Sequence, residues 1–284
     1  MFELAFKIVV NGLMSSLVYI LMALGFTLIF GIMRIVNFAH GELYMIAAFL
    51  VYVLVGSLGW NYYLVIVLAA LGVGVFGAAL ERVLFRPFVG RELQGMIMAL
   101  AVSITLQAAA FILFGPNDQS VPRPISGVFD IGAMVIPRDR VAVGASALVI
   151  LSAFYVFMRY TKTGLAMRAV VQDEAIASIY GVRPKLIHPL AFGMGAMLAG
   201  SAGALMAPIY TIHPYMGAQP MLKAFIVVIL GGLGSVPGAV LGGVVLGLLE
   251  SGFATLINTT VATMVSFGIV VVILLFKPTG LLGR

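Results

Sequence analysis

The stretch Gly31–Glu42, GIMRIVNFAHGE, places an arginine, an asparagine, a histidine and a glutamate between two long apolar runs. A second stretch, Gly231–Gly238 (GGLGSVPG), interrupts another apolar run with glycines, a serine and a proline. A helix in a bilayer satisfies its own backbone, so broken backbone at membrane depth is tolerated only where protein or water covers it. Two breaks in corresponding places of two halves are the pattern expected of a transport pathway. We therefore expect these two breaks to organise the fold.

The composition is that of a membrane protein. Of the 284 residues, 62% are hydrophobic and 9% charged, and the mean hydropathy is +1.17. Soluble domains carry about a quarter charged residues, so most of this surface must face lipid or protein. The net charge of +6 comes from basic residues in short loops, which indicates the positive-inside distribution rather than nucleic-acid binding. The chain has no cysteine, which excludes disulfides and Cys-based metal sites.

Six apolar runs approach the roughly 20 residues that a spanning helix needs. They are Ile8–Phe30, Tyr62–Leu84, Leu93–Phe114, Val141–Met158, Ile187–Ile209 and Val261–Phe276. Two more, Leu43–Leu58 and Leu222–Glu250, are shorter or broken. The N-terminus lacks a basic n-region, which indicates a retained first span rather than a signal peptide. The prediction is an all-α polytopic membrane protein with about eight segments. These form two pseudo-repeat halves with two glycine-interrupted, discontinuous or re-entrant segments, in a single transmembrane domain over residues 1–284.

Lys and Arg set the expected orientation. The basic loops 159–185 and 81–92 are expected to be cytoplasmic, and the proline-rich loop 115–140 to be extracytoplasmic. The basic tail 277–284 is also expected in the cytoplasm, which requires Leu222–Glu250 to enter and leave on one face as a hairpin. The side of the N-terminus is left open.

The polar residues of the first break have two interpretations. An ionisable group at membrane depth is a functional hypothesis by default, whereas a loop at the membrane surface, with Asn37 capping a helix that starts near Ala39, is equally compatible with the sequence. A half-helix N-terminus here would favour an anionic group of a solute. The candidate path residues are Asn37, His40, Glu42, Gly231, Gly232, Gly234, Ser235 and Pro237.

No enzyme constellation is visible in the chain. A Walker A loop and an H-E-x-x-H motif are absent, and the three histidines are too scattered for a metal site, so we expect no cofactor. A stand-alone ion-coupled transporter and a passive channel remain as rivals to a transport subunit driven by a partner. The scarcity of acidic residues within the spans, with Glu250 a partial exception, speaks against a proton relay.

The segment Arg159–Lys185 predicts a cytoplasmic helix. Leu165–Ile179 has a helix-forming composition, with Thr163 as a cap, Gly181 as a left-handed stop and Pro184 as the end. Its apolar residues suit docking into the groove of a partner. The alternative is a solvated connector with ordinary positive-inside charge.

Three blocks carry a family resemblance: LGFTLIFGIMRIVNFAHGELYMIAAF, TGLAMRAVVQDEAIASIYGV and GGLGSVPGAVLGGVVLGLLE. Together they resemble the permease subunits of branched-chain amino acid (LIV-type) ABC importers, in the same order over essentially the whole chain. The VNFAHGE block is most similar to the smaller of the two permeases paired in such systems.

The resemblance implies a non-catalytic subunit of the bacterial-type inner membrane. Its partners would be a second homologous permease, two cytoplasmic ABC ATPases and a periplasmic or extracellular solute-binding protein, with no role for nucleic acid. The ATPase-coupling positions on the matching block would be Gly164, Arg168, Ala169, Asp173, Ala175 and Gly181. The solute would be a branched-chain or related amino acid, although relatives with these motifs resemble carriers of urea, amides or small carboxylates.

Overall fold

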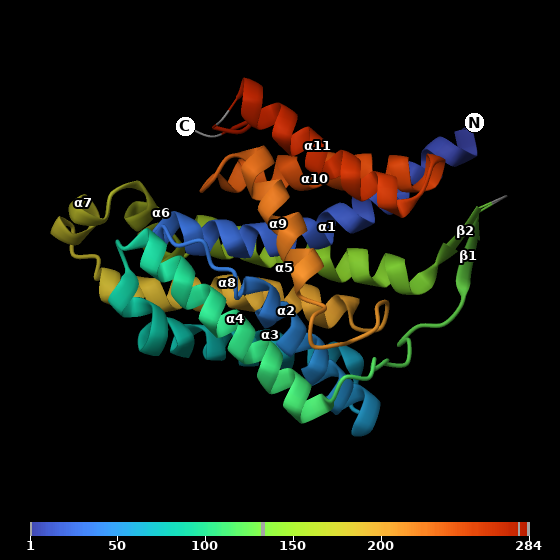
Figure 1. Ribbon diagram of the computed structural model, residues 1–284, viewed down its shortest axis with the longest axis horizontal. Coiled ribbons are helices and arrows are strands. Elements are labelled where there is room, and N and C mark those ends of the chain that lie inside the picture. Colours follow the sequence, from blue (N-terminus) through green and yellow to red (C-terminus); the bar gives the residue numbers. More distant parts are fainter. Residues whose placement is uncertain (1, 132–133, 278, 283–284) are drawn as a thin grey trace.

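The computed structural model describes residues 2–131, 134–277 and 279–282. Its helices form one bundle (Figure 1). The α-helices are α1 (Phe2–Met33), α2 (His40–Val51), α3 (Tyr62–Leu80), α4 (Glu92–Phe114), α5 (Arg138–Tyr160), α6 (Lys162–Gln172), α7 (Glu174–Ile179), α8 (Pro184–Met206), α9 (Ala218–Gly231), α10 (Val236–Leu256) and α11 (Thr259–Phe276). The π-helix Tyr52–Ser57 continues α2, and the π- and 3-10 turns Glu81–Phe85 and Arg86–Phe88 continue α3.

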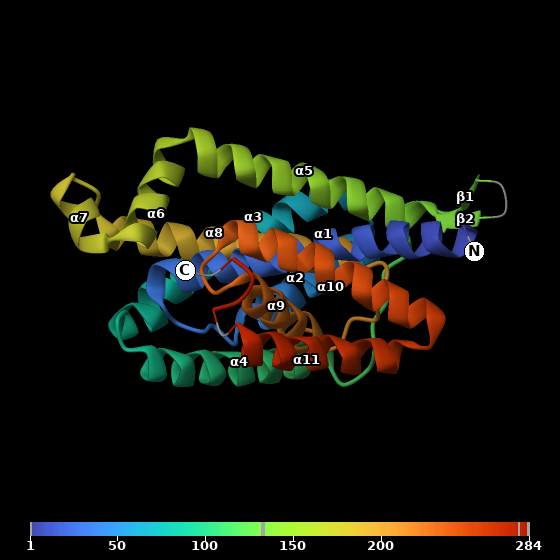
Figure 2. The same cartoon turned by 90° about the horizontal axis from the view of Figure 1, so that it is seen from above.

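The two ends of the bundle are distinct in Figures 1 and 2. One carries α6 and α7 and is called the α6–α7 end. The other carries the antiparallel strands β1 (Val128–Ile131) and β2 (Met134–Pro137) and is called the hairpin end. The N-terminus lies at the hairpin end, and the C-terminus lies toward the α6–α7 end (Figure 2).

The chain contains two halves that run in opposite directions. Helix α1 runs toward the α6–α7 end, whereas α8 runs away from it (Figure 1). The packing repeats accordingly: α1 lies along α10 and α2 along α8 in one set, and α8 lies along α3 and α9 along α1 in the other. Helices α1 to α4 thus correspond to α8 to α11 with inverted direction, and α5 to α7 connect the two halves.

Small residues line the seams between the paired helices. Gly247 of α10 lies against Ser16 and the Gly12 carbonyl of α1, and Gly77 of α3 lies against Ala196 of α8. In lipid, close backbone approach and packing replace the hydrophobic drive for helix association. This confirms, for these positions, that the glycine-rich spans serve tight helix packing.

Each half is broken at the same place, after its first helix. Arg34 ends α1 with a φ of 54°, and the chain then returns into the bundle before α2 begins at His40 (Figure 1). In the second half, residues 207–217 separate α8 from α9. The starts of α2 and α9 meet, because Gly41 and Gly217 pack against each other's carbonyl groups. The two breaks therefore converge in the centre of the molecule.

The meeting point lies at mid-depth of the bundle. His40 and Gly195 both pack on Gly25 of α1, and Gly195 is the midpoint of α8. At 1.5 Å per residue, it lies about 16 Å from either end of that helix. The polar residues around His40 thus lie at mid-depth of the bundle, which contradicts a loop at its surface, while the predicted helix start near Ala39 is confirmed.

The number of membrane segments is close to the prediction, but the C-terminal apolar sequence is divided into helices at other positions. Seven helices of the described residues are long and apolar enough to cross a membrane, and α9 and the apolar part of α11 are shorter. The expected same-face hairpin over Leu222–Glu250 is wrong. Helix α9 starts at mid-depth and ends toward the α6–α7 end, and α10 then runs the length of the bundle (Figure 1). The re-entry occurs earlier, in residues 207–217.

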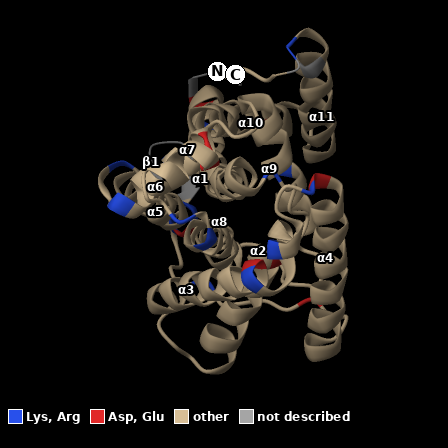
Figure 3. Ribbon diagram, turned by 90° about the vertical axis from the view of Figure 1, so that its left-hand side faces the viewer, with Lys and Arg blue, Asp and Glu red and all other residues tan. Residues whose placement is uncertain are grey.

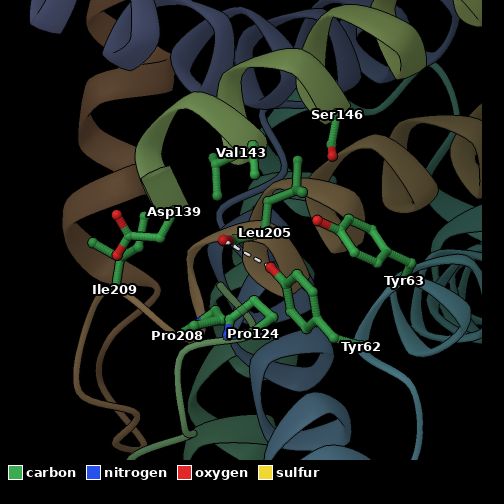
Figure 4. Close-up of a pocket in the computed structure, with 10 residues that line it drawn as sticks. Tyr62, Tyr63, Pro124, Asp139, Val143, Ser146, Leu205, Pro208 and Ile209 are labelled. Atoms are coloured by element: carbon green, nitrogen blue, oxygen red, sulfur yellow. Dashed lines mark hydrogen bonds between the residues drawn. The ribbon is translucent and has the colours of Figure 1, made fainter. Parts of the chain in front are cut away.

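The loop at the hairpin end is anchored to the bundle. Gln119 pairs with Ile212 of the second break through an isolated antiparallel bridge, and Arg123 forms an ion pair of 3.2 Å with Asp139 at the start of α5. Beside it, the Tyr62 hydroxyl donates to the Leu205 carbonyl at 3.1 Å, which ties α3 to the end of α8 (Figure 4). Of the predicted loop 115–140, residues 132–133 lie outside the described residues.

Candidate functional site

A cavity of about 400 Å³ lies between α1, the second break and the start of α9. Its lining combines hydroxyl, imidazole, amide and ammonium groups with three methionines. The lining residues are Ser15, Val18, Tyr19, Met22, Tyr44, Met206, Tyr210, Thr211, His213, Tyr215, Met216, Gln219, Pro220 and Lys223. Tyr210 and Tyr215 are also exposed at the surface. A pocket of this size with an apolar side and a few polar groups is typical of a small-molecule site.

The floor of this cavity is the place where the two breaks meet. Met22 and Tyr44 line the cavity, and the Met22 carbonyl accepts a hydrogen bond of 3.1 Å from His40 Nε2. Met216 lines it directly before Gly217, the residue in contact with Gly41. The cavity therefore ends at the starts of α2 and α9, near mid-depth.

A charged cluster lies at one wall of the cavity, which Tyr19 and Lys223 line. Lys223 Nζ on α9 lies 2.5 Å from Glu250 Oε1 on α10 and donates to the Tyr19 hydroxyl of α1 at 2.9 Å. That hydroxyl in turn donates to Glu250 Oε2 at 2.6 Å. Helices α1, α9 and α10 thus meet through one small hydrogen-bond network inside the apolar bundle, where ionisable groups are functional candidates.

The predicted path residues of the first break are packed shut. Asn37, His40 and Glu42 are all buried, and they are not among the cavity-lining residues. Asn37 Oδ1 accepts from the Ala39 backbone N–H at 3.1 Å, directly before α2. Glu42 Oε1 accepts from Ser103 Oγ at 3.0 Å and from Gln107 Nε2 at 2.7 Å, which joins α2 to α4. These contacts hold the start of α2 in place.

The break Gly231–Gly238 forms the turn between α9 and α10. Gly231 and Gly238 are in backbone contact, and Ser235 Oγ accepts from the Gly238 N–H at 3.1 Å at the start of α10. Backbone N–H groups of Leu281 and Leu282 bind the carbonyls of Leu230 and Gly231. Of the other predicted path residues, Gly232 and Gly234 belong to the same turn, and Pro237 lies in the first turn of α10. The structure does not bring this turn to the first break, and residues 207–217 are the true counterpart.

The sequence carries a signal for the cavity in the segment between α8 and α9 and in Lys223. Pro208, Pro214 and Gly217 interrupt the apolar sequence between α8 and α9. Lys223 is a single cation within the apolar piece Met221–Leu230. A lone lysine in an apolar segment is itself a functional indication.

A second candidate surface lies at the α6–α7 end, where Figure 3 shows basic residues distributed over the face. The expected helix Leu165–Ile179 is two helices, because Asp173 takes an extended conformation and caps α7 by accepting from the Ile176 N–H at 2.9 Å. Thr161, not Thr163, caps α6. Gly181 has the predicted left-handed φ, 85°, whereas Pro184 begins α8 instead of ending this helix.

The two short helices expose apolar side chains and enclose a groove. Leu165, Ile176, Ile179 and Tyr180 are exposed, and a cavity of about 520 Å³ between α6 and α7 is lined partly by Leu165, Ile176 and Tyr180. Met167 and Val170 are buried toward the bundle. The surface thus has one apolar face fixed to the bundle and one that no other described residue of the chain covers.

The predicted coupling residues differ in how far they are exposed at the α6–α7 end. Ala169 and Asp173 line the groove, and Ala175 and Gly181 are exposed. Gly164 is buried where α6 folds against the backbone of Phe157 and Met158. Arg168 is half-buried. From α7, Glu174 Oε2 lies 3.5 Å from His188 Nε2 of α8, which connects this surface to the bundle.

Inverted halves of membrane-length helices, a polar cavity ending at mid-depth and an apolar docking face define a multi-pass membrane transport protein. The family described as "Branched-chain amino acid transport system / permease component" matches residues 8–275. The chain belongs to this family, and it is a permease subunit of the ABC-importer type in the inner membrane.

The curated relatives agree with this assignment. The chain is 33% identical over 294 residues to the high-affinity branched-chain amino acid transport system permease protein LivH of Escherichia coli, covering 96% of this chain and 94% of LivH. It is 33% identical to the permease protein BraD of Pseudomonas aeruginosa, over 97% of this chain and 94% of BraD. The match to LivM of Escherichia coli is 26%, over 94% of this chain and 68% of LivM. The predicted likeness to the smaller permease is confirmed. No solved structure matches the chain.

Proposed function

We propose that this chain, together with a second permease, forms the path by which an ATP-driven importer takes up branched-chain amino acids. The cavity between α1, the second break and α9 is the part of the path that faces outward. The hairpin end is extracytoplasmic and the α6–α7 end cytoplasmic, because the turns at the α6–α7 end carry the dense basic loops 81–92 and 159–185. The N-terminus is then outside, and the described tail residues, Lys277 and 279–282, are inside. Pro278, Gly283 and Arg284 lie outside the described residues.

One observation carries this proposal: the cavity reaches mid-depth and ends where two helices begin. Met22, Met206 and Met216 supply an apolar wall, and Tyr19, His213 and Lys223 supply polar groups. Such a two-sided lining suits a solute with an apolar side chain and a charged head group, because each part finds its own surroundings. Urea has no apolar part to occupy the methionine wall, and acetamide has only one methyl group.

The energy would come from partner ATPases seated on α6 and α7. The exposed Leu165, Ile176 and Ile179 offer an apolar face for a groove in another protein. The ion pair between Glu174 and His188 would transmit a displacement of α7 to α8. Because α8 packs on α1, α2 and α3, its movement would reach the floor of the cavity. The subunit itself would then be non-catalytic, with a binding protein delivering solute at the hairpin end.

Uptake into liposomes tests the transport function. The complex of both permeases and the ATPases, with the binding protein outside and ATP inside, is expected to accumulate radiolabelled leucine, isoleucine or valine above its external concentration. A variant complex with an inactive ATPase is expected to show no accumulation. If this chain alone accumulates as much solute under a proton or sodium gradient, it is an ion-coupled transporter. If solute leaks through the complex without ATP, the protein is a channel.

Replacing Leu165 by Asp tests the docking face. This side chain is 60% exposed in α6, and Leu58 at the hairpin end, which is 59% exposed, provides a matched control. We expect Leu165→Asp to abolish solute-stimulated ATP hydrolysis, since a carboxylate in an apolar interface is not solvated. Leu58→Asp is expected to retain that stimulation. Coupled hydrolysis in both variants would contradict the assignment of α6 and α7 to the ATPase.

A further inference from the structure

We propose that Lys223 is the recognition point for the carboxylate of the solute, with the Tyr19 hydroxyl beside it and Glu250 as the residue that positions it. This inference rests on the proposed function and names the group that fixes one end of the solute in the cavity. The ligand class is a small organic carboxylate, here the α-carboxylate of an amino acid.

The geometry places the ammonium at the edge of the cavity and its partner behind it. Lys223 and Tyr19 both line the cavity, whereas Glu250 is not among the lining residues. The Lys223 side chain retains 24% of its exposure and that of Glu250 16%. The ammonium also lies 5.1 Å from the centre of the Tyr19 ring. A solute that enters the cavity thus meets the lysine before the glutamate.

The Lys223 ammonium has one N–H donor left for a ligand. A lysine ammonium has three N–H donors. One goes to Glu250 Oε1 and a second to the Tyr19 hydroxyl. Within the described part of the chain, the third has no partner. A carboxylate in the cavity could accept it, as a charge-assisted hydrogen bond.

The arrangement is poorly explained as a device for stability. An ion pair among apolar helices loses much of its attraction to desolvation, and well-packed apolar residues of similar volume often serve as well or better. The Lys223–Glu250 pair differs from a purely structural ion pair because Lys223 lies at the cavity wall. Glu250 keeps the lysine oriented while no solute is bound, and the Tyr19 hydroxyl bridges the two.

The apolar wall then sets where the solute's side chain lies. Met22 and Val18 belong to the same helix, α1, as Tyr19. A solute held by its carboxylate at Lys223 can direct a branched aliphatic side chain toward these residues. The two parts of the lining therefore select together: the lysine requires a carboxylate, and the methionine wall favours an aliphatic group.

The decisive test neutralises both charges at once. The double variant Lys223→Met and Glu250→Gln removes the ion pair without leaving one charge buried and alone. If the pair serves stability only, the double variant assembles and transports within about twofold of wild type, and the assignment is overturned. If Lys223 binds the solute, uptake falls by roughly 10–100-fold at equal assembly, the range of one charge-assisted hydrogen bond. Lys7→Met, at an exposed position of α1, is the matched control and should transport as wild type.

A chemical rescue covers the case in which the double variant fails to assemble. The chain has no cysteine, so Lys223→Cys can be modified selectively in complexes with cysteine-free partner subunits. Modification with 2-aminoethyl methanethiosulfonate restores an ammonium and is expected to restore uptake. The sulfonate analogue adds an anion and is expected to leave uptake lost. Rescue by both reagents, or full uptake by the unmodified variant, would overturn the assignment.

Uptake of different solutes by the wild-type complex tests the role of Lys223 and the proposed function separately. Wild type is expected to accumulate leucine but not leucinamide, which keeps the side chain and lacks the carboxylate. Accumulation of urea or acetamide and of no amino acid would contradict the proposed function. Accumulation of leucine and leucinamide alike would leave the proposed function standing and contradict the role of Lys223.

Discussion

The two breaks in the bundle have the same place in the fold and opposite surroundings. Residues 34–39 return the chain to mid-depth in the first half, and residues 207–217 do so in the second. The first break leads into buried polar groups that bind their neighbours, among them Asn37 and His40. The second has three exposed residues, Tyr210, Thr211 and Tyr215, and lines a cavity through Tyr210, Thr211 and His213. The two inverted halves thus differ: the first break is closed by packing, and the second borders an open cavity.

The difference follows from what covers each helix start. Helix α2 begins under α1, α8 and α4, and Ser103 and Gln107 of α4 bind its glutamate. The start of α9 packs on the start of α2 through Gly217 and Gly41, and the cavity lies beside it. In alternating access, two inverted halves exchange such roles around a central site. We therefore interpret the structure as an outward-open arrangement closed below the start of α2.

The largest expected effect comes from separating the two helix starts. In Gly217→Val, the new side chain would overlap the Gly41 carbonyl group and α2 could not keep its position. Overpacking a tight contact costs about 1–3 kcal/mol and more where backbone is in the way. We expect little assembled complex and a lower melting midpoint of what remains, measured by size-exclusion chromatography and thermal denaturation.

Gly72→Val is the control for that substitution. A side chain at this exposed position of α3 meets nothing within 4 Å. Its yield and melting midpoint should equal those of wild type. Normal assembly of Gly217→Val would show that the two breaks do not depend on contact at mid-depth.

A smaller effect is expected at the closed break, from removing the Glu42 carboxylate. Glu42→Ala leaves Ser103 and Gln107 without their shared acceptor, at a cost of about 1–3 kcal/mol. Glu42→Gln keeps an acceptor oxygen in the same place and should retain stability and uptake. Both are measured as melting midpoint and as leucine uptake per assembled complex.

The comparison of these two variants separates packing from transport chemistry. A stable Glu42→Gln complex without uptake would show that the charge itself works in the pathway. The closed break would then have to open to the solute during each cycle.

The smallest effect is expected at the turn between α9 and α10. Ser235→Ala removes the cap on the Gly238 N–H and should cost about 1 kcal/mol. Uptake per assembled complex should be unchanged, because this turn is covered by the C-terminal Leu281 and Leu282. A strong loss of uptake at normal stability would return this turn to the translocation path.

The sequence alone was sufficient for the membrane class, for most of the spans and for the position of the first break. These depend on hydropathy and on single residues such as Asn37, whose contacts are local. The partner of the first break could not be predicted, because GGLGSVPG and residues 207–217 both interrupt apolar sequence. Only packing, here of Gly41 on Gly217, distinguishes a turn at the bundle end from a return to mid-depth.

The charged cluster was missed for a related reason. Tyr19, Lys223 and Glu250 lie on three helices far apart in sequence and meet only in the folded bundle. Hydropathy averaging treats the lysine as one polar residue in an apolar run. For α6 and α7, the sequence predicted the docking element and its left-handed stop at Gly181, but not the break at Asp173, whose side chain competes with the helix for a backbone N–H.

Cysteine accessibility tests the comparison between the two breaks most directly. Gln219→Cys, in the cavity wall directly after the second break, and Asn37→Cys in the first break can be introduced singly, since the chain contains no cysteine. In complexes with cysteine-free partners and no nucleotide, a membrane-impermeant thiol reagent is added from the hairpin side. We expect Gln219→Cys to react and to be protected by leucine, whereas Asn37→Cys should not react. Reaction and leucine protection at Asn37→Cys, with no reaction at Gln219→Cys, would contradict this expectation.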